Sequence, residues 1–310
     1  MKPLLGRRVD SMKLAEIGKK ICELRNEMNL TQGELAEGIC TQALISLIEK
    51  GESDPNATIL YQIAKKLGVD VNYFFHIGST PRLDYVHEVE KQVRKLRVVY
   101  QYKEMMDIVR TEEKNPLFYN DPQKLQFLYW HKSIYYFEVE KDHEKAESML
   151  EKAFDIFPRH KRAYTEMEME MMMTRCNYRY QIGQYENVVE LYSRLEHILV
   201  GTKRILTNKS IRTRFYYNLA RAHTMLGNFG KSLALLNEGI DWCIECEELY
   251  LMPPLHYLTG YTYERMENYE KALEYLDYSI QLYDLTPGHP VEEFLSEKRS
   301  NYIEVLRGKE

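Results

Sequence analysis

The sequence predicts an all-α protein, and three observations carry that prediction. The chain has 310 residues but only 15 glycines and 10 prolines, few for the many turns of an all-β protein. Apolar residues recur at helical spacing, first over residues 13–28. Beyond residue 100, one helical pattern then repeats five times at intervals of 40 to 44 residues.

Composition narrows the class of protein. The N-terminus lacks the apolar stretch of a secretory signal, and no run of 18 apolar residues could cross a membrane. The five cysteines are odd in number and scattered, which favours reduced thiols. We therefore expect a cytoplasmic protein without membrane contact.

Charge is unevenly distributed along the chain. Residues 1–80 carry ten basic and ten acidic side chains, so the net charge of −5 belongs to residues 81–310. The chain has no bulk basic field for nucleic acid. Any DNA affinity must come from local placement of side chains and from two copies of the chain acting together.

The first 80 residues carry five short helical patterns. Thr31 and Glu34 form a capping box at the start of the second, and Gly38 helps to end it. Thr41 is the N-cap candidate of the third, where Ile45 and Ile48 face inward. Helices two and three, joined by a tight turn, predict a helix-turn-helix domain.

The residues "LRNEMNLTQGELAEGI" and "ISLIEKGESDPNATILYQIAKKLGV" make this segment resemble the Cro/lambda-repressor (XRE) family. The resemblance implies a salt bridge between Arg25 and Glu49, a phosphate contact by Gln32, and a third helix that faces the major groove. Glutamine can bind adenine through two hydrogen bonds, which fits Gln42. The expected DNA-binding residues are Gln32, Thr41, Gln42, Ala43, Leu44, Ser46, Leu47 and Lys50.

Leu44 and Leu47 stand where family members often carry polar or basic residues. One interpretation is that both contact thymine methyl groups. Another is that they pack on the second helix or are simply exposed, as single leucines often are. A third is that the module no longer binds DNA.

The repeated pattern has an aromatic or histidine residue after each polar turn. These anchors are Tyr102, His143, Tyr185, Phe229 and Tyr269. Three residues after each anchor stand Met105, Ala146, Val188, Ser232 and Ala272. With Trp130, Ala146, Ala153 and Pro158 on its pattern, the segment resembles the tetratricopeptide repeat (TPR).

That resemblance predicts about five helix pairs stacked in a right-handed superhelix, closed by a capping helix over "VEEFLSEKRSNYIEVLRGK". The expected domains are an N-terminal arm (1–12), the helix-turn-helix domain (13–78), a linker helix leading into the first repeat (79–100), and a peptide-binding and dimerisation domain (101–310).

The concave positions, counted back from each anchor, are rich in arginine, tyrosine and asparagine, which suit an extended peptide. Solvated helix faces would look similar from spacing alone. The expected peptide-binding residues are Arg94, Arg97, Tyr135, Asn177, Tyr180, Gln181, Arg214, Tyr217, Asn218, Arg221, Tyr257, Tyr261 and Arg265.

The two halves together resemble the RNPP family of quorum-sensing regulators, on "GIC-TQ" before the third helix, "QYKE" at 101–104 and the "YYNLARA" segment that contains Asn218. The resemblance implies that Asn218 holds the backbone of a short signalling peptide. It also implies a homodimer that binds a two-fold symmetric operator in double-stranded DNA.

We expect an activator, although a repressor released by peptide stays open. A TPR adaptor that binds partner proteins, similar to phosphatase inhibitors, is the alternative from another class. No catalytic motif supports an enzyme, and no cofactor is expected. Cys243 and Cys246 form a single CxxC, whereas a zinc site needs two further ligands, so no metal site is expected.

Overall fold

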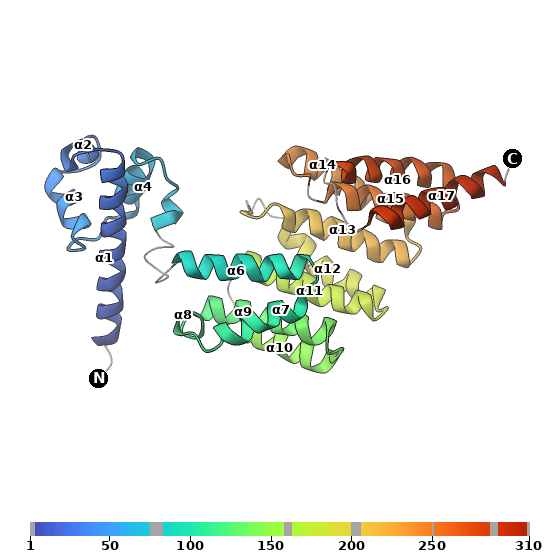
Figure 1. Cartoon of the computed structure of the whole chain (residues 1–310), viewed down its shortest axis with the longest axis horizontal. Helices are drawn as coiled ribbons and strands as arrows, with labels where there is room; N and C mark the ends of the chain where they lie inside the picture. The colour runs from blue at the N-terminus through green and yellow to red at the C-terminus, as the bar shows by residue number, and fades with distance from the viewer. Residues whose placement is uncertain are drawn as a thin grey trace. The chain divides into compact units, whose positions relative to one another are not determined.

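The computed structural model describes residues 4–74, 83–157, 163–199, 206–249, 251–285 and 291–308. These residues form helices and no strand, which confirms the all-α prediction (Figure 1). The chain divides into two compact units, Met1–His131 and Lys132–Glu310. The limits expected for the individual domains stay predictions.

The helix-turn-helix domain has four helices and a further helical turn at residues 71–74. The helices are α1 (Leu4–Glu27), α2 (Gln32–Ala36), α3 (Gln42–Glu49) and α4 (Ala57–Lys66). Residues 4–12, expected as an arm, continue α1 toward the N-terminus. Caps were predicted correctly: Thr31 and Glu34 form the capping box of α2, and Thr41 accepts from the Leu44 N–H at the start of α3.

The core of this domain is apolar and closely packed. Ile45 and Ile48 of α3 are buried as predicted. In α4, Leu60 is buried and Ile59 is partly buried against the same core. Helices α1 and α3 approach at Gly18, where an added Cβ would lie 1.9 Å from the Ile48 carbonyl oxygen. The close approach therefore requires glycine at this position.

The remaining described helices form pairs. The first of each pair are α6 (Leu83–Val98), α9 (Pro122–Glu138), α11 (Glu166–Gln181), α13 (Ser210–Met225) and α15 (Met252–Arg265). The second of each pair are α7 (Tyr102–Glu112), α10 (His143–Asp155), α12 (Tyr185–Leu199), α14 (Phe229–Cys246) and α16 (Tyr269–Asp284). A short helix, α8 (Pro116–Tyr119), precedes α9.

Every predicted anchor is the first residue of the second helix of its pair. Two residues before each anchor the backbone adopts a left-handed conformation, with φ between 54° and 79°. These five residues are Tyr100, Lys141, Gly183, Gly227 and Glu267. A left-handed residue at this place ends one helix and lets the chain reverse into the next.

Burial follows the repeat. The five residues that stand three positions after the anchors are all buried, as are Trp130 and Ala153. Pro158 lies outside the described residues. Within the second unit each helix from α11 to α16 packs on the next, and α13 also contacts both α11 and α15. The expected capping helix is α17 (Glu292–Arg307), whose Leu295 and Tyr302 pack against α16.

Candidate DNA-binding and peptide-binding surfaces

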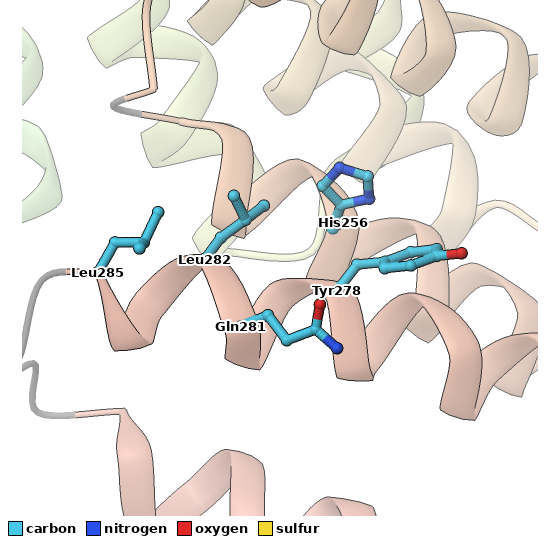
Figure 2. Close-up of a pocket in the computed structure, with 5 residues that line it drawn as sticks. All are labelled: His256, Tyr278, Gln281, Leu282 and Leu285. Atoms are coloured by element: carbon cyan, nitrogen blue, oxygen red, sulfur yellow. The ribbon is translucent and has the colours of Figure 1, made fainter.

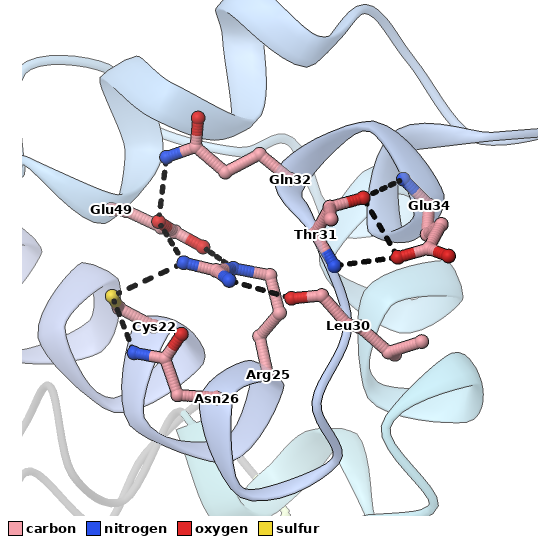
Figure 3. Close-up of polar contacts among 8 residues, drawn as sticks. All are labelled: Cys22, Arg25, Asn26, Leu30, Thr31, Gln32, Glu34 and Glu49. Carbon is pink, nitrogen blue, oxygen red and sulfur yellow. Dashed lines mark hydrogen bonds and ion pairs between the residues drawn. The ribbon is translucent and has the colours of Figure 1, made fainter.

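A polar network joins the first three helices of the DNA-binding candidate (Figure 3). Arg25 Nε lies 2.6 Å from Glu49 Oε1, and Arg25 Nη2 lies 3.1 Å from Glu49 Oε2, which confirms the expected salt bridge. Arg25 Nη1 donates to the Leu30 carbonyl at 2.6 Å, and Gln32 Nε2 donates to Glu49 Oε2 at 2.8 Å. The network fixes α3 relative to α1 and the turn before α2.

The Glu49 carboxylate is buried yet stays charged. Burial raises its pKa, but the hydrogen bonds from Arg25 and Gln32 outweigh burial, so the pKa lies below its ordinary value of 4.5. Gln32, expected at a phosphate, already donates one N–H to this carboxylate. Since a glutamine amide has two N–H groups, the second is left for a phosphate.

One face of α3 is available to a ligand. Gln42, Ala43 and Leu47 are exposed, Ser46 is half-buried, and Lys50 is exposed at the C-cap. At 100° per residue Ala43, Ser46, Leu47 and Lys50 point away from the buried Ile45 and Ile48, and Gln42 lies at the edge of this face. Thr41 is exposed before this face, and its hydroxyl caps the helix. The structure therefore brings most of the expected DNA-binding residues to one surface.

The two leucines of α3 have different environments. Leu44 packs partly against the core of the domain, in agreement with the packing interpretation. Leu47 is 41% exposed and lies on the same side of α3 as Ala43 and Lys50. Only Leu47 is therefore placed to contact a thymine methyl group without a change in the core.

In the first unit, Arg94 and Arg97 of α6 stack on aromatic rings of α9. The guanidinium carbon of Arg97 is 4.7 Å from the Trp130 ring centroid, and that of Arg94 is 5.4 Å from the Phe127 centroid. His131 lies beside both rings, and burial, with the nearby Arg97 and Arg94 charges, holds its pKa well below the ordinary value. These cations thus take part in helix packing.

In the second unit, four of the expected peptide-binding residues form one group, called here the Arg221 cluster: Asn177, Tyr180, Tyr217 and Arg221. The guanidinium carbon of Arg221 lies 3.8 Å from the Tyr180 ring centroid and 5.7 Å from that of Tyr217. Arg221 Nη2 donates to Asn177 Oδ1 at 3.1 Å. Burial raises the pKa of Tyr180, and the charge of Arg221 opposes this shift.

Three other expected residues are paired with neighbours on adjacent first helices. Arg214 Nη2 lies 2.5 Å from the buried Glu170 Oε1. Gln181 Nε2 donates to Glu138 Oε1 at 2.8 Å, and Arg265 Nη1 lies 3.9 Å from the Met225 sulfur. Glu170 was not predicted as a site residue. Its separation of 44 residues from Arg214 equals one repeat interval, and this spacing is the signal that could have found it.

Tyr257 and Tyr261 lie where the capping helix joins α15. Their rings stack with centroids 6.5 Å apart, and Tyr257 also contacts Phe294 of α17 at 5.9 Å. Lys298 of α17 lies 5.3 Å from the Tyr261 ring centroid. Burial raises the pKa of Tyr257, and the nearby Glu264, Tyr217 and Tyr261 add to this shift, which places the pair near the Arg221 cluster. Tyr135, half-buried on α9, packs its ring 5.8 Å from that of Tyr136.

Asn218 is the most buried of the expected peptide-binding residues, at 9% exposed. Its amide lies beside the hydroxyl of Tyr192, a buried group without a well-formed hydrogen bond among the described residues. Burial raises the pKa of Tyr192 well above its ordinary value, while Asn218 acts to lower it. Little of the Asn218 side chain is therefore open to a ligand in this conformation.

A cavity of about 420 Å³ lies on α15 and α16, lined by His256, Tyr278, Gln281, Leu282 and Leu285 (Figure 2). None of the expected binding residues lines it. Burial lowers the pKa of His256, which favours the neutral ring. The cavity is therefore separate from the Arg221 cluster.

The described residues contain no group of three or more His, Cys, Asp or Glu positioned to hold a metal ion. Burial raises the pKa of the Cys243 and Cys246 thiols, which disfavours the reactive thiolate. In the described part of the chain, no helix is long and apolar enough to span a bilayer.

Two protein-family models match this chain, one in its N-terminal domain and one in its repeats. A helix-turn-helix family model matches residues 22–74, and a tetratricopeptide repeat model matches residues 253–283. Comparison with the curated proteins gives no match. The chain thus combines a helix-turn-helix domain with tetratricopeptide-type repeats.

Several solved structures share this fold. The Bacillus thuringiensis regulator PlcR, in complex with the peptide PapR7 and DNA, is 23% identical with a TM-score of 0.81, over 91% of this chain and 99% of that one. ComR of S. thermophilus, with DNA and its signalling peptide ComS, is 18% identical with a TM-score of 0.63, over 92% and 99%. The Streptococcus dysgalactiae pheromone receptor Rgg2 is 15% identical with a TM-score of 0.62, over 92% and 99%.

Proposed function

We propose that this chain is a transcription regulator that binds double-stranded DNA through α3 and is controlled by a short signalling peptide bound by the repeats. In this proposal residues 13–78 bind DNA, residues 79–100 link the domains, and residues 101–310 bind peptide and form a homodimer in the cytoplasm. The dimer would present two copies of α3 to a two-fold symmetric operator.

The observation that carries the proposal is the presence of both surfaces on one chain. The exposed face of α3 holds Gln42, Ser46 and Leu47, which suit base edges and thymine methyl groups. The Arg221 cluster holds an amide, two aromatic rings and a cation, which suit the backbone and side chains of a peptide. Structures of PlcR and ComR that share this fold contain a peptide and DNA.

Peptide control requires that the peptide bind the DNA-competent state more tightly than the other state, because a ligand shifts an equilibrium only by that difference. An activator would gain operator affinity with peptide, and a repressor would lose it. We propose the activator, and the test below also detects the repressor.

The test is selection of binding sites from random duplex DNA by the purified full-length chain, with and without a peptide fraction of the host's culture medium. Enrichment of a two-fold symmetric site only with peptide would support the activator. Enrichment lost on adding peptide would identify a repressor. Failure to enrich any site in both conditions would contradict the DNA-binding function and favour a protein-binding adaptor.

A further inference from the structure

Three of the six arginines on α11, α13 and α15 pair with carboxylates within the chain. Arg214 pairs with Glu170, and Arg175 Nε lies 2.7 Å from Glu147 Oε1. Arg179 Nη2 lies 3.4 Å from Glu147 Oε2. A carboxylate partner compensates a guanidinium for the water it loses on burial. The positive charge of each of these arginines is therefore already compensated within the chain.

Arg221 differs from them. Its polar contact is with the neutral amide of Asn177, and its guanidinium lies against the rings of Tyr180 and Tyr217. The Nε of Arg221 is buried and has no hydrogen-bond partner. Among the residues that the structure describes, no carboxylate lies within salt-bridge distance of this side chain.

The side chains that contact Arg221 fix the position of its guanidinium group. Two aromatic rings and an amide orient the guanidinium, and the rings displace part of its water. An oriented, partly dehydrated guanidinium binds a carboxylate better than a mobile, solvated one, because less entropy and less hydration are lost on binding. Its unused N–H groups form the planar fork that matches two carboxylate oxygens.

We propose that Arg221 selects a peptide that carries a carboxylate, either an aspartate or glutamate side chain or a free C-terminus, and binds that group within the Arg221 cluster. This inference rests on the proposed function, in which the repeats bind a short peptide. It goes beyond that function because it specifies the charged group of the peptide and the residue that binds this group. Arg265 is a weaker candidate, since its side chain is exposed and its charge is screened by water.

The experiment uses the full-length chain and two libraries of short random peptides. One library includes aspartate and glutamate, and the other replaces them with asparagine and glutamine. Each is made with a free C-terminal acid and with a C-terminal amide. Peptides retained by the protein in gel filtration are identified by mass spectrometry, and circular dichroism confirms that each variant is folded.

We expect peptides with a carboxylate to be enriched about tenfold to a hundredfold, the range for one charge-assisted hydrogen-bonded contact. Arg221→Gln should remove the enrichment while still retaining neutral peptides. Arg221→Lys, which keeps the charge but not the fork, should keep part of it. Arg194→Gln removes one exposed positive charge from α12 of the same unit and should leave the enrichment intact.

The two C-terminal forms separate the sources of the carboxylate. Enrichment that survives amidation assigns an aspartate or glutamate side chain, and enrichment lost on amidation assigns the C-terminus. Retained peptides without carboxylate preference, or a preference unchanged in Arg221→Gln, would overturn this inference alone. Retention of no peptide from any library would contradict the proposed peptide binding as well.

Discussion

At the scale of single residues, Glu49 connects three helices through two different partners. It accepts from Arg25 of α1 and from Gln32 of α2, while it belongs to α3 itself. Its side chain is only 5% exposed, so loss of either partner would leave a buried charge without full compensation. The orientation of α3, and hence of its exposed face, depends on this carboxylate.

The lowered pKa of Glu49 makes stability depend on pH. A carboxyl group with a folded-state pKa below 4.5 stabilises the fold above pH 4.5, and this contribution is lost as pH falls through the folded-state value. Glu49→Gln should lower the free energy of unfolding at pH 7 by about 2 kcal/mol. It should also reduce the loss of stability below pH 4.5.

Urea unfolding of the full chain between pH 7 and pH 3 measures both effects. Glu52→Gln serves as control, because Glu52 is an exposed acid just beyond α3. Equal pH profiles for Glu49→Gln and the unmodified chain would show that the network does not stabilise the domain.

Gln42 is the residue of α3 best suited to read a base. Gln42→Ala should weaken binding to the selected operator by about 1–3 kcal/mol, because one bidentate contact to adenine would be lost. Non-specific DNA binding should not change. Fluorescence anisotropy with operator and scrambled duplexes checks this, with the exposed Gln123→Ala as a matched control. Unchanged operator affinity would mean that α3 does not read the site through Gln42.

At the scale of elements, the turn within each helix pair sets the repeat. All five turns contain a left-handed residue two positions before the anchor, but only two of these residues are glycine. Asn268 N–H donates to the Tyr263 carbonyl, as Asn228 N–H does to that of His223. The same hydrogen bond thus closes a turn with Glu267 and a turn with Gly227, although only glycine adopts this conformation without strain.

Glycine at position 267 should therefore stabilise the protein. Glu267 is exposed with φ of 60°, and Glu267→Gly should raise the free energy of unfolding by about 1 kcal/mol, because the left-handed strain is removed. Glu267→Ala removes the same charge but keeps the strain, so it should not stabilise.

The converse substitution, Gly227→Ala, should lower stability by about 1 kcal/mol. Thermal and urea unfolding of the three variants provide the comparison. Equal stability of Glu267→Gly and Glu267→Ala would show that the charge, and not the backbone, decides the effect at this turn.

At the scale of the whole molecule, the proposed regulation requires coupling between the repeats and the helix-turn-helix domain. The repeats suit this role because each first helix contacts its neighbours, as Arg214 contacts Glu170 and Arg221 contacts Asn177. A peptide held by several first helices would change their mutual packing. The coupling free energy would appear as a change in operator affinity when peptide binds.

Asn218→Ala tests this coupling. In the proposed function Asn218 holds the peptide backbone, so the variant should lose the peptide-dependent change in operator affinity. Peptide-free DNA binding should stay within about twofold of that of the unmodified chain, because α3 is not altered. The exposed Asn237→Ala is the matched control.

Anisotropy titrations with and without the peptide fraction measure the response. Because Asn218 is buried beside Tyr192, circular dichroism must show the same helix content in the variant. A full peptide response in folded Asn218→Ala would show that the peptide does not depend on this amide.

Local chemistry explains which features could be predicted. The capping box of Thr31 and Glu34, the cap at Thr41 and the five anchors all act within a few residues of the chain, so their spacing is visible in the sequence. The Arg25–Glu49 salt bridge could be predicted only from the family resemblance, because its two residues are 24 positions apart in the sequence. The start of α1 was misplaced because residues 4–12 lack a clear apolar stripe.

The sequence by itself determined the helices, their pairing and the exposed face of α3, because these follow from local hydrogen bonding and the period of burial. Only the tertiary structure decided how the arginines are used. Arg214 and Arg221 stand seven residues apart on α13, yet Arg214 meets the Glu170 carboxylate and Arg221 meets only an amide and two aromatic rings. The partner of a long side chain depends on the neighbouring helix, and helical period does not encode it.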